Sequence, residues 1–225
     1  MKVRVKFSKT GVIRFIGHLD LMRYFQKAFR RTDYRVKYSG GFSPHMIMSF
    51  AQALGVGIES QGEYFDVELE DNQDIDALTE ELNKQMVDGI HVISCKILPE
   101  GAGNAMASVA AGSYDIIFDK ENPITEDIIS SYHSKEEIPY TKTTKSGETT
   151  FNIKEFVYDI GYIEKGVSFT IAASSAGNIR TQYILEVLAM LGNFELEAYP
   201  YHVFRKDLLL KNKEGKLVPL NEVDE

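Results

Sequence analysis

Basic residues recur at helical spacing near the start of the chain. In the segment from His18 to Arg31, Arg23, Lys27 and Arg30 fall within a narrow arc at 100° per residue, with Arg31 beside them. The opposite side is apolar and holds Leu19, Leu21, Met22, Phe25, Ala28 and Phe29. One side of such a helix would pack, and the other could bind an anion. Each of these basic residues, taken alone, is more simply interpreted as a solvated side chain on a surface helix whose terminal charges compensate the helix dipole.

The charge of the chain is segregated along the sequence. The first fifty residues hold eleven Lys and Arg against two Asp and Glu, whereas residues 51–225 hold fourteen against thirty-one. The net charge of −8 argues against a protein that coats nucleic acid over its whole surface. A local excess of +9 on an acidic body favours one anion site, for nucleic acid or for an acidic partner.

Aromatic residues alternate with the basic ones just after this helix. Tyr38 and Phe42 lie close to Lys37, a mixture that can stack bases and neutralise phosphates, although aromatics more often serve the core. Arg180 enters a later helix after Asn178, where an anion site and a simple helix cap are both open interpretations. The predicted binding surface, for RNA or a partner, comprises His18, Arg23, Lys27, Arg30, Arg31, Lys37, Tyr38, Phe42, Ser43, His45 and Arg180.

The sequence predicts neither a metal site nor a cofactor. The five histidines are scattered without metal-ligand spacing, and Cys95 is the only cysteine. His18 and His45 could act as acid and base if the fold joined them, but a helix-capping and a loop histidine are the simpler interpretation. Pro44 makes a serine nucleophile at Ser43 improbable. The loop from Ser8 to Gly11 lacks the phosphate-binding spacing of a Walker motif.

Composition indicates an ordinary globular protein. The 225 residues are 44% hydrophobic and 26% charged, which permits one large or two small domains. No secretory leader and no apolar run of roughly 20 residues is present, so no membrane association is expected. A single cysteine suits a reducing compartment, and we expect a cytoplasmic location.

The order of predicted elements sets the expected fold class. In the first hundred residues, strands are expected at 2–8, 34–38, 63–69 and 91–98, extended pieces at 12–16 and 46–50, and helices at 18–31 and 74–86. After a boundary at 99–103, strands are expected at 111–118, 138–144, 149–153, 157–163, 167–172 and 201–205, helices at 125–132 and 178–191, hairpin turns at 145–147 and 164–166, and a terminal hairpin of 207–211 with 216–220. This predicts an α+β protein of two tandem ferredoxin-like (βαββαβ) halves with antiparallel sheets, residues 1–100 and 101–225.

Several N-terminal stretches together resemble a known family. They are Phe7-Ser-Lys-Thr-Gly11, Arg14-Phe-Ile-Gly-His-Leu-Asp-Leu-Met-Arg23, Arg30-Arg31, Tyr38-Ser-Gly-Gly-Phe-Ser-Pro-His45, Ser49-Phe-Ala51 and Gly57-Ile-Glu-Ser-Gln-Gly-Glu-Tyr64, with a weaker match at 176–180, where Thr181 stands in place of an expected proline. The chain resembles the radical-SAM-linked protein family, whose function is unknown and whose members lie beside, or fused to, a radical SAM protein. The resemblance implies a radical SAM partner and no catalytic residues.

The expected function follows from the basic N-terminal segment and from the family resemblance. Without a CxxxCxxC motif the chain cannot hold the radical-generating cluster, so we expect a non-catalytic accessory or substrate-binding subunit that presents RNA or another anionic substrate to a radical SAM protein. The alternative is a stand-alone RNA-binding or RNA-processing protein similar in architecture to the ferredoxin-like proteins of CRISPR systems. A stand-alone enzyme remains a third hypothesis.

Overall fold

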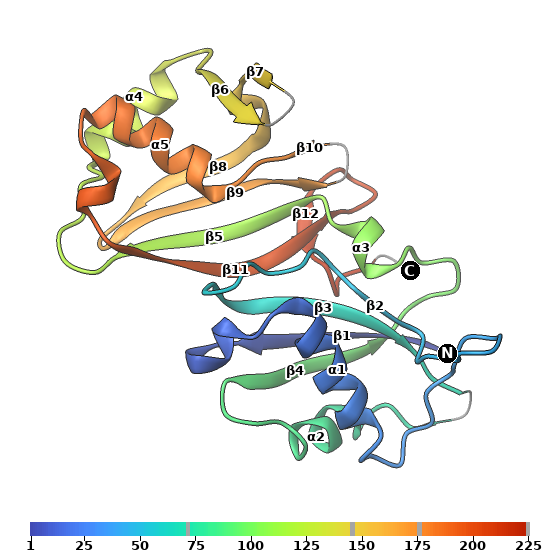
Figure 1. Ribbon diagram of the computed structural model, residues 1–225. Helices are drawn as coiled ribbons and strands as arrows, with labels where there is room; N and C mark the ends of the chain where they lie inside the picture. The colour runs from blue at the N-terminus through green and yellow to red at the C-terminus, as the bar shows by residue number, and fades with distance from the viewer. Residues whose placement is uncertain (71–72, 145–146, 175–176, 224–225) are drawn as a thin grey trace. The chain divides into compact units, whose positions relative to one another are not determined.

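The computed structural model describes residues 1–70, 73–144, 147–174 and 177–223, and the chain divides into two compact units. Unit 1 comprises Met1–Ala110 and Arg205–Glu225, and unit 2 comprises Ala111–Phe204. Both mix helices with mostly antiparallel strands, so the α+β class is confirmed (Figure 1). The division differs from the predicted one at residues 100 and 101, because the segment after Phe204 packs with the N-terminal residues.

Unit 1 is built on one sheet. Its strands are β1 (Lys2–Lys9), β2 (Met48–Phe50), β3 (Glu59–Glu68), β4 (Ile90–Ile97), β12 (Leu217–Pro219) and, from Arg205 onward, β11 (Tyr201–Lys211). The neighbours run in the order β11, β3, β1, β4, while β2 also pairs with β3 and β12 with β11. The helices are α1 (His18–Phe29), α2 (Leu78–Asn83) and the short α3 (Ala105–Ser108). Helices α1 and α2 lie on one face of the β1, β3 and β4 strands (Figure 1).

The core of unit 1 explains why α1 forms where the apolar period predicts it. Phe25 of α1 is fully buried, with its ring centroid 4.7 Å from those of Phe7 and Phe65. Phe50 stacks on Phe65 at 4.8 Å. Burial of a large aromatic side chain contributes about 1.5–3 kcal/mol, so this cluster fixes which side of α1 faces the sheet. The predicted apolar side is the buried one, except that Leu19 is exposed.

Three predicted elements of unit 1 are wrong in detail. Residues 11–15 form a 3-10 helix, η1 (Gly11–Phe15), where an extended piece was expected. Residues 34–38 form only the isolated bridges Val36↔Leu69 and Tyr38↔Met46. Helix α2 starts at Leu78 and not at Asp74, because the Asp74 carboxylate accepts a hydrogen bond from the backbone N–H of Asp76 in a local turn.

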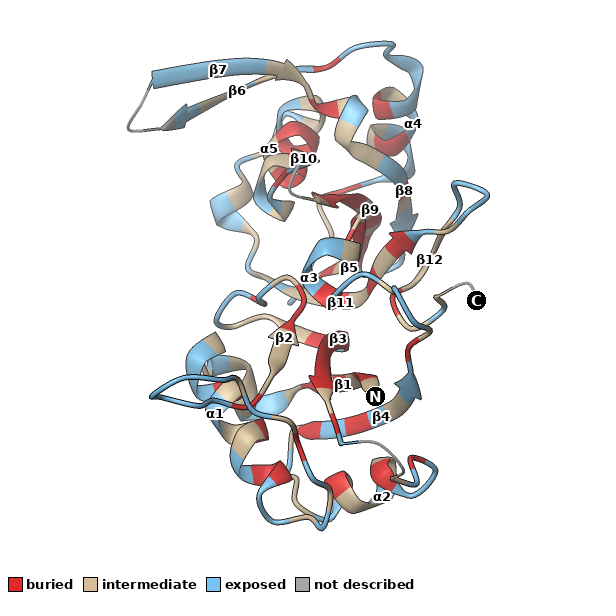
Figure 2. Cartoon of the chain, turned by 90° about the vertical axis from the view of Figure 1, so that its right-hand side faces the viewer, coloured by how far each residue is buried: buried red, intermediate tan, exposed pale blue. Residues whose placement is uncertain are grey.

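Unit 2 contains a further set of strands and helices. Its elements are β5 (Ala111–Phe118), α4 (Glu126–Ser134), β6 (Pro139–Thr144), β7 (Gly147–Asn152), η2 (Ile153–Phe156), β8 (Val157–Ile163), β9 (Gly166–Ser174), β10 (Gly177–Asn178), α5 (Thr181–Gly192) and η3 (Leu196–Ala198). Strand β9 pairs with β5, β8 and β10, and β6 pairs with β7 in a separate hairpin. Figure 2 shows buried residues along β5 and β9 and an exposed β6–β7 hairpin.

The predictions for unit 2 are largely confirmed. Thr125 caps α4, as expected, by accepting a hydrogen bond from the N–H of Ile128 at 3.4 Å. Helix α5 begins at Thr181, because Asn178 belongs to β10 and Arg180 occupies the N-cap position. The predicted turn at 145–147 includes residues 145 and 146, which lie outside the described residues. One continuous β11 replaces the two strands predicted at 201–205 and 207–211.

No helix in the described ranges is long and apolar enough to cross a membrane.

Candidate functional site

The sheet face of unit 1 opposite α1 and α2 carries a buried charge pair. Arg4 alternates along β1 with Val3 and Val5, which face the helices, yet it is also 0% exposed. Its guanidinium donates hydrogen bonds to both carboxylate oxygens of Asp66, at 2.7 and 3.0 Å, and to the carbonyl oxygens of Leu220 and Gly103, at 2.7 and 3.0 Å. The segment after Phe204 and the residues before α3 therefore cover this face of β1.

A second buried pair lies in the same unit. Arg205 donates to Glu63 from Nε at 2.7 Å and to the carbonyl oxygen of Gln52 at 3.0 Å. Nearby, the Tyr64 hydroxyl donates to the Asp207 carboxylate at 2.6 Å, and Lys6 Nζ lies 2.7 Å from the same carboxylate. Burial, and then the negative charge of Asp207, raise the pKa of Tyr64. Because the charges of Arg205, Glu63, Lys6 and Asp207 are paired with one another, these contacts hold the strands in place and do not form a ligand site.

Lys9 positions the start of α1. Its side chain is 1% exposed, and Nζ donates to the carbonyl oxygens of Ile16, at 2.7 Å, and Arg14, at 3.3 Å. Burial lowers the pKa of Lys9, while the charge of Glu63 raises it and that of Arg205 lowers it. Residues 11–15 turn as η1, and this turn brings both carbonyl oxygens to Lys9. Lys9 is thus unable to cradle a phosphate.

His18 lines a small internal cavity beside these groups. The cavity has a volume of about 10 Å³ and is bounded by Lys9, His18, Gln52, Glu63 and six other residues. The His18 ring stands edge-on to Phe50, with centroids 5.4 Å apart. A space of this size accommodates one water at most, so it is no substrate pocket.

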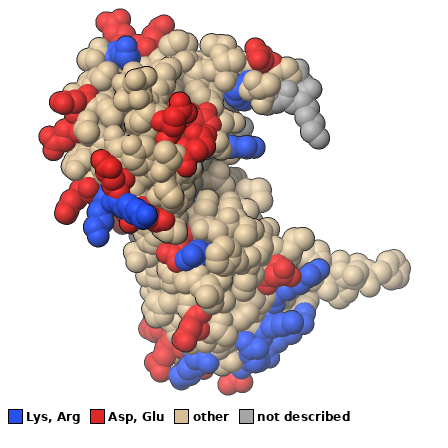
Figure 3. Space-filling view, turned by 60° about the vertical axis from the view of Figure 1, so that its left-hand side comes forward, with Lys and Arg blue, Asp and Glu red and all other residues tan. Residues whose placement is uncertain are grey.

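The outer face of α1 carries three exposed cations of the predicted site. Arg23, Lys27 and Arg30 are all exposed. Arg23 lies 3.5 Å from Asp20, whereas Lys27 and Arg30 have no ion-pair partner among the residues that the structure describes. Arg31 donates to the side chain and the backbone of Gln85, at 3.1 and 3.3 Å. Figure 3 shows Lys and Arg side chains gathered in a band on one part of the surface.

The loop between α1 and β2 carries the predicted aromatics. Tyr38 and Phe42 are exposed, as are Ser43 and His45, while Lys37 is half-buried. In Figures 1 and 2 this loop projects from unit 1 at the level of α1. Neither aromatic residue belongs to the core of unit 1.

The α1 cations and the residues of this loop belong to the same unit. His18 packs against Phe50, and His45 is hydrogen-bonded to Ser39. These described contacts do not place the two histidines together as a general acid and base. Arg180 is exposed and belongs to unit 2. Within the described ranges, no three His, Cys, Asp or Glu side chains gather as a metal site.

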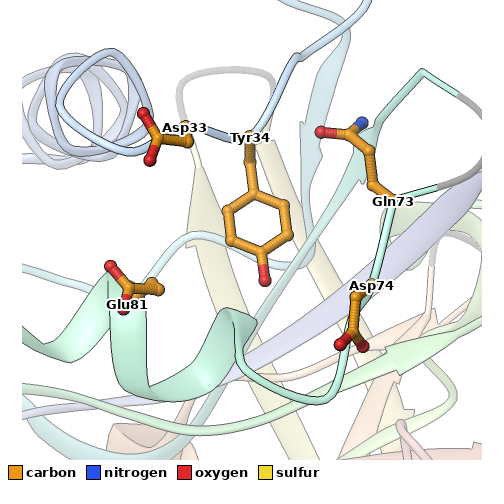
Figure 4. A pocket seen from close by; sticks show the side chains of 5 residues that line it. All are labelled: Asp33, Tyr34, Gln73, Asp74 and Glu81. Atoms are coloured by element: carbon orange, nitrogen blue, oxygen red, sulfur yellow. The ribbon is translucent and has the colours of Figure 1, made fainter.

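A second cavity in unit 1 is acidic. It has a volume of about 330 Å³ and is lined by Asp33, Tyr34, Gln73, Asp74 and Glu81. Figure 4 shows the Tyr34 hydroxyl directed between Glu81 and Asp74. Burial, followed by the charges of Asp74 and Glu81, raises the pKa of Tyr34. The carboxylates that line this cavity repel anions, so the cavity cannot bind the same class of ligand as the basic face of α1.

The sequence profile of a bacterial family matches residues 2–181, and its description reads "Uncharacterized protein conserved in bacteria (DUF2344)". The chain belongs to this family. The DUF2344 match covers all of β1 to β10 and names no activity. No curated protein matches the chain. Among solved structures, an unknown protein from Galdieria sulphuraria is 11% identical over 91% of this chain and 97% of its own, with a TM-score of 0.29.

Proposed function

We propose that this protein binds RNA through unit 1, with the exposed face of α1 contacting phosphates. The observation that carries the proposal is the pair Lys27 and Arg30, which are exposed and have no ion-pair partner in the described part of the chain. A charge that is neither buried nor paired contributes little to folding. The same charge adjacent to a phosphate releases counterions and adds affinity.

The charge distribution supports an anionic ligand for this face. Of the thirteen charged residues in the first fifty, eleven are basic, although the whole chain carries −8. Five of those basic residues are held in contacts within unit 1: Arg4, Lys6, Lys9, Arg14 and Arg35. The remaining excess is concentrated on α1 and on the residues that follow it, which makes a local basic surface on an acidic body.

The test compares two charge-reversal variants. Lys27→Glu/Arg30→Glu alters the proposed surface, and Lys120→Glu/Lys165→Glu makes the same change at exposed lysines of unit 2. Each variant carries −12, because two reversals add −4 to the −8 of the parent. Fluorescence anisotropy on a labelled RNA should show at least about 10-fold weaker binding for the α1 variant and little change for the control. Thermal melts should match for all three proteins.

The salt dependence provides a second readout. If Lys27 and Arg30 each neutralise a phosphate of a single strand, the magnitude of the log–log slope of affinity against salt should fall by about 1.4 in the α1 variant, which is roughly 0.7 for each contact. Equal affinities and equal slopes for the α1 variant and the parent would refute RNA binding by this face.

The accessory role is a separate part of the proposal. The N-terminal resemblance to the radical-SAM-linked family implies a radical SAM partner in the same cytoplasm, which would supply the iron–sulfur cluster. Cys95, the single cysteine, is a poor ligand for such a cluster, because burial raises the pKa of its thiol to about 11. Affinity purification from native cells, with RNA and protein both identified, tests it. Recovery of RNA without a radical SAM protein would favour the stand-alone RNA-binding alternative.

The ferredoxin-like description also remains a proposal. In unit 1, the order β4, β1, β3, β2 with antiparallel neighbours, and two helices on one face, supports it. Strand β11, which pairs with β3 beyond that set, is an addition to the simple arrangement.

A further inference from the structure

The loop between Tyr38 and Met46 has a closed stem and an exposed tip. Tyr38 pairs with Met46 in an antiparallel bridge, and the N–H of Ser39 donates to the carbonyl oxygen of His45 at 2.9 Å. The Ser39 hydroxyl shares a hydrogen bond with Nδ1 of His45 at 2.9 Å and accepts one from the His45 N–H at 3.1 Å. The base of the loop is therefore held by hydrogen bonds, and residues 40–44 form the tip.

Phe42 stands at the centre of this tip with its side chain fully exposed. Gly41, at φ +98°, provides the left-handed backbone that turns the chain just before it. The ring contributes to neither hydrophobic core of the described chain. An exposed aromatic ring on a hydrogen-bonded stem has no folding role, and its bare face is available to a ligand.

The charges of this loop and of α1, both in unit 1, favour one class of ligand. Residues 38–48 contain no Asp or Glu, Lys37 lies at the base of the loop, and Lys27 and Arg30 lie on α1. Stacking between an aromatic side chain and a base is worth about 1–3 kcal/mol, and cations beside the ring can neutralise the adjoining phosphates. An apolar protein surface would match the ring but not these cations.

We propose that Phe42 stacks on an unpaired base, so that the RNA bound by unit 1 is single-stranded. This inference rests on the proposed function and specifies its substrate. In a duplex the bases are already stacked on one another, and a loop residue would reach a ring face only by extruding a nucleotide, at a cost of a few kcal/mol. A loop, bulge or free end of RNA presents that face without this cost.

The first test compares Phe42→Ala with Phe15→Ala on two RNAs. Phe15 is the matched control, since it is also an exposed phenylalanine of unit 1, at 60% exposure. On an unstructured single-stranded oligonucleotide, Phe42→Ala should bind about 5- to 150-fold more weakly, which is the conversion of about 1–3 kcal/mol. On a blunt RNA duplex it should bind within about 2-fold of the parent. Its salt slope should stay unchanged, because no phosphate contact is lost.

The second test reports stacking directly. The chain contains no tryptophan, so Phe42→Trp introduces a single indole reporter. Its affinity for the single strand should match or exceed that of the parent, and its emission should be quenched at saturation. A DNA oligonucleotide of the same sequence shows whether the ribose contributes. Unchanged emission at saturation, or single-strand binding by Phe42→Ala equal to that of the parent, would overturn the inference.

The two proposals fail in different ways. If Lys27→Glu/Arg30→Glu loses binding while Phe42→Ala retains it, the basic surface stands and the stacking role is wrong. If neither variant changes binding, the proposed function itself is wrong.

Discussion

Arg205 and Glu63, 142 positions apart in the sequence, form a buried ion pair with Nε and a terminal nitrogen of the guanidinium 2.7 and 2.5 Å from the two carboxylate oxygens. Replacing Arg205 with alanine would leave the Glu63 carboxylate buried without its partner. We expect the free energy of unfolding to fall by about 3–5 kcal/mol, because an uncompensated buried charge is costly. Urea unfolding followed by circular dichroism measures this loss.

The control for that variant is an exposed ion pair in the same unit. Arg23→Ala breaks the pairing with Asp20, whose side chain is 71% exposed, and should change stability by at most about 1 kcal/mol. Similar losses in the two variants would mean that the Arg205 pair is not what holds this part of the sheet.

Arg4→Lys should loosen the segment after Phe204 without a change of charge. A lysine has one terminal nitrogen and cannot reach Asp66, Gly103 and Leu220 together, as the Arg4 guanidinium does. Hydrogen exchange of β11 and β12 amides should therefore be faster in the variant. Peptides from β5 and β9 serve as the internal reference, and acceleration there to the same extent would contradict a local effect.

The stability of the protein should fall as the pH rises from about 9 to 11, in part through Cys95. Burial raises the pKa of this thiol from 9.0 to about 11. In that interval the unfolded chain releases the thiol proton while the folded chain retains it, so increasing pH favours unfolding. Cys95→Ala removes this contribution and should make the decline shallower. Urea midpoints of both proteins at about pH 8 and pH 10.5 test the difference, and parallel declines would contradict it.

Gly166 should tolerate no side chain. A Cβ at this position would collide with the carbonyl oxygen of Ile116 on the neighbouring strand, whereas one at Gly161 in β8 would meet nothing within 4 Å. Gly166→Ala should lower stability by about 1–3 kcal/mol through forced backbone shifts. Gly161→Ala should have a smaller effect, and paired thermal melts compare them. A Gly166→Ala protein that melts with the parent would show that the strands separate easily.

Local sequence patterns predicted the elements whose residues contact near neighbours or one apolar face. Helix α1 was predictable because its apolar period matches the buried side chains of Leu21, Phe25 and Phe29. The exposed cations Lys27 and Arg30 follow from the same period. These residues share a property: their environment is set by the helix itself and by the sheet that it covers.

The buried charges were not predictable in this way. Arg4 alternates with Val3 and Val5 exactly as a solvent-facing residue would, but a segment more than two hundred positions later covers it. The sequence did contain one indication of buried pairing, which is the opposite charge of two strands: β1 carries Arg4, Lys6 and Lys9, and β3 carries Glu63 and Asp66. Opposite charges on strands that become neighbours indicate a pairing, although only the structure shows that the pairing is buried.

The covering of Arg4 by Leu220 also has a consequence for biosynthesis. During translation, residues 111–204 of unit 2 emerge from the ribosome as a continuous stretch, while unit 1 still lacks the segment that begins at Arg205. While unit 2 is synthesised, Glu63 therefore lacks Arg205, and Arg4, although it can already pair with Asp66, lacks the carbonyl oxygen of Leu220. Domains usually fold in the order in which they are made. Here the N-terminal unit is the one that a nascent-chain chaperone would have to protect longest.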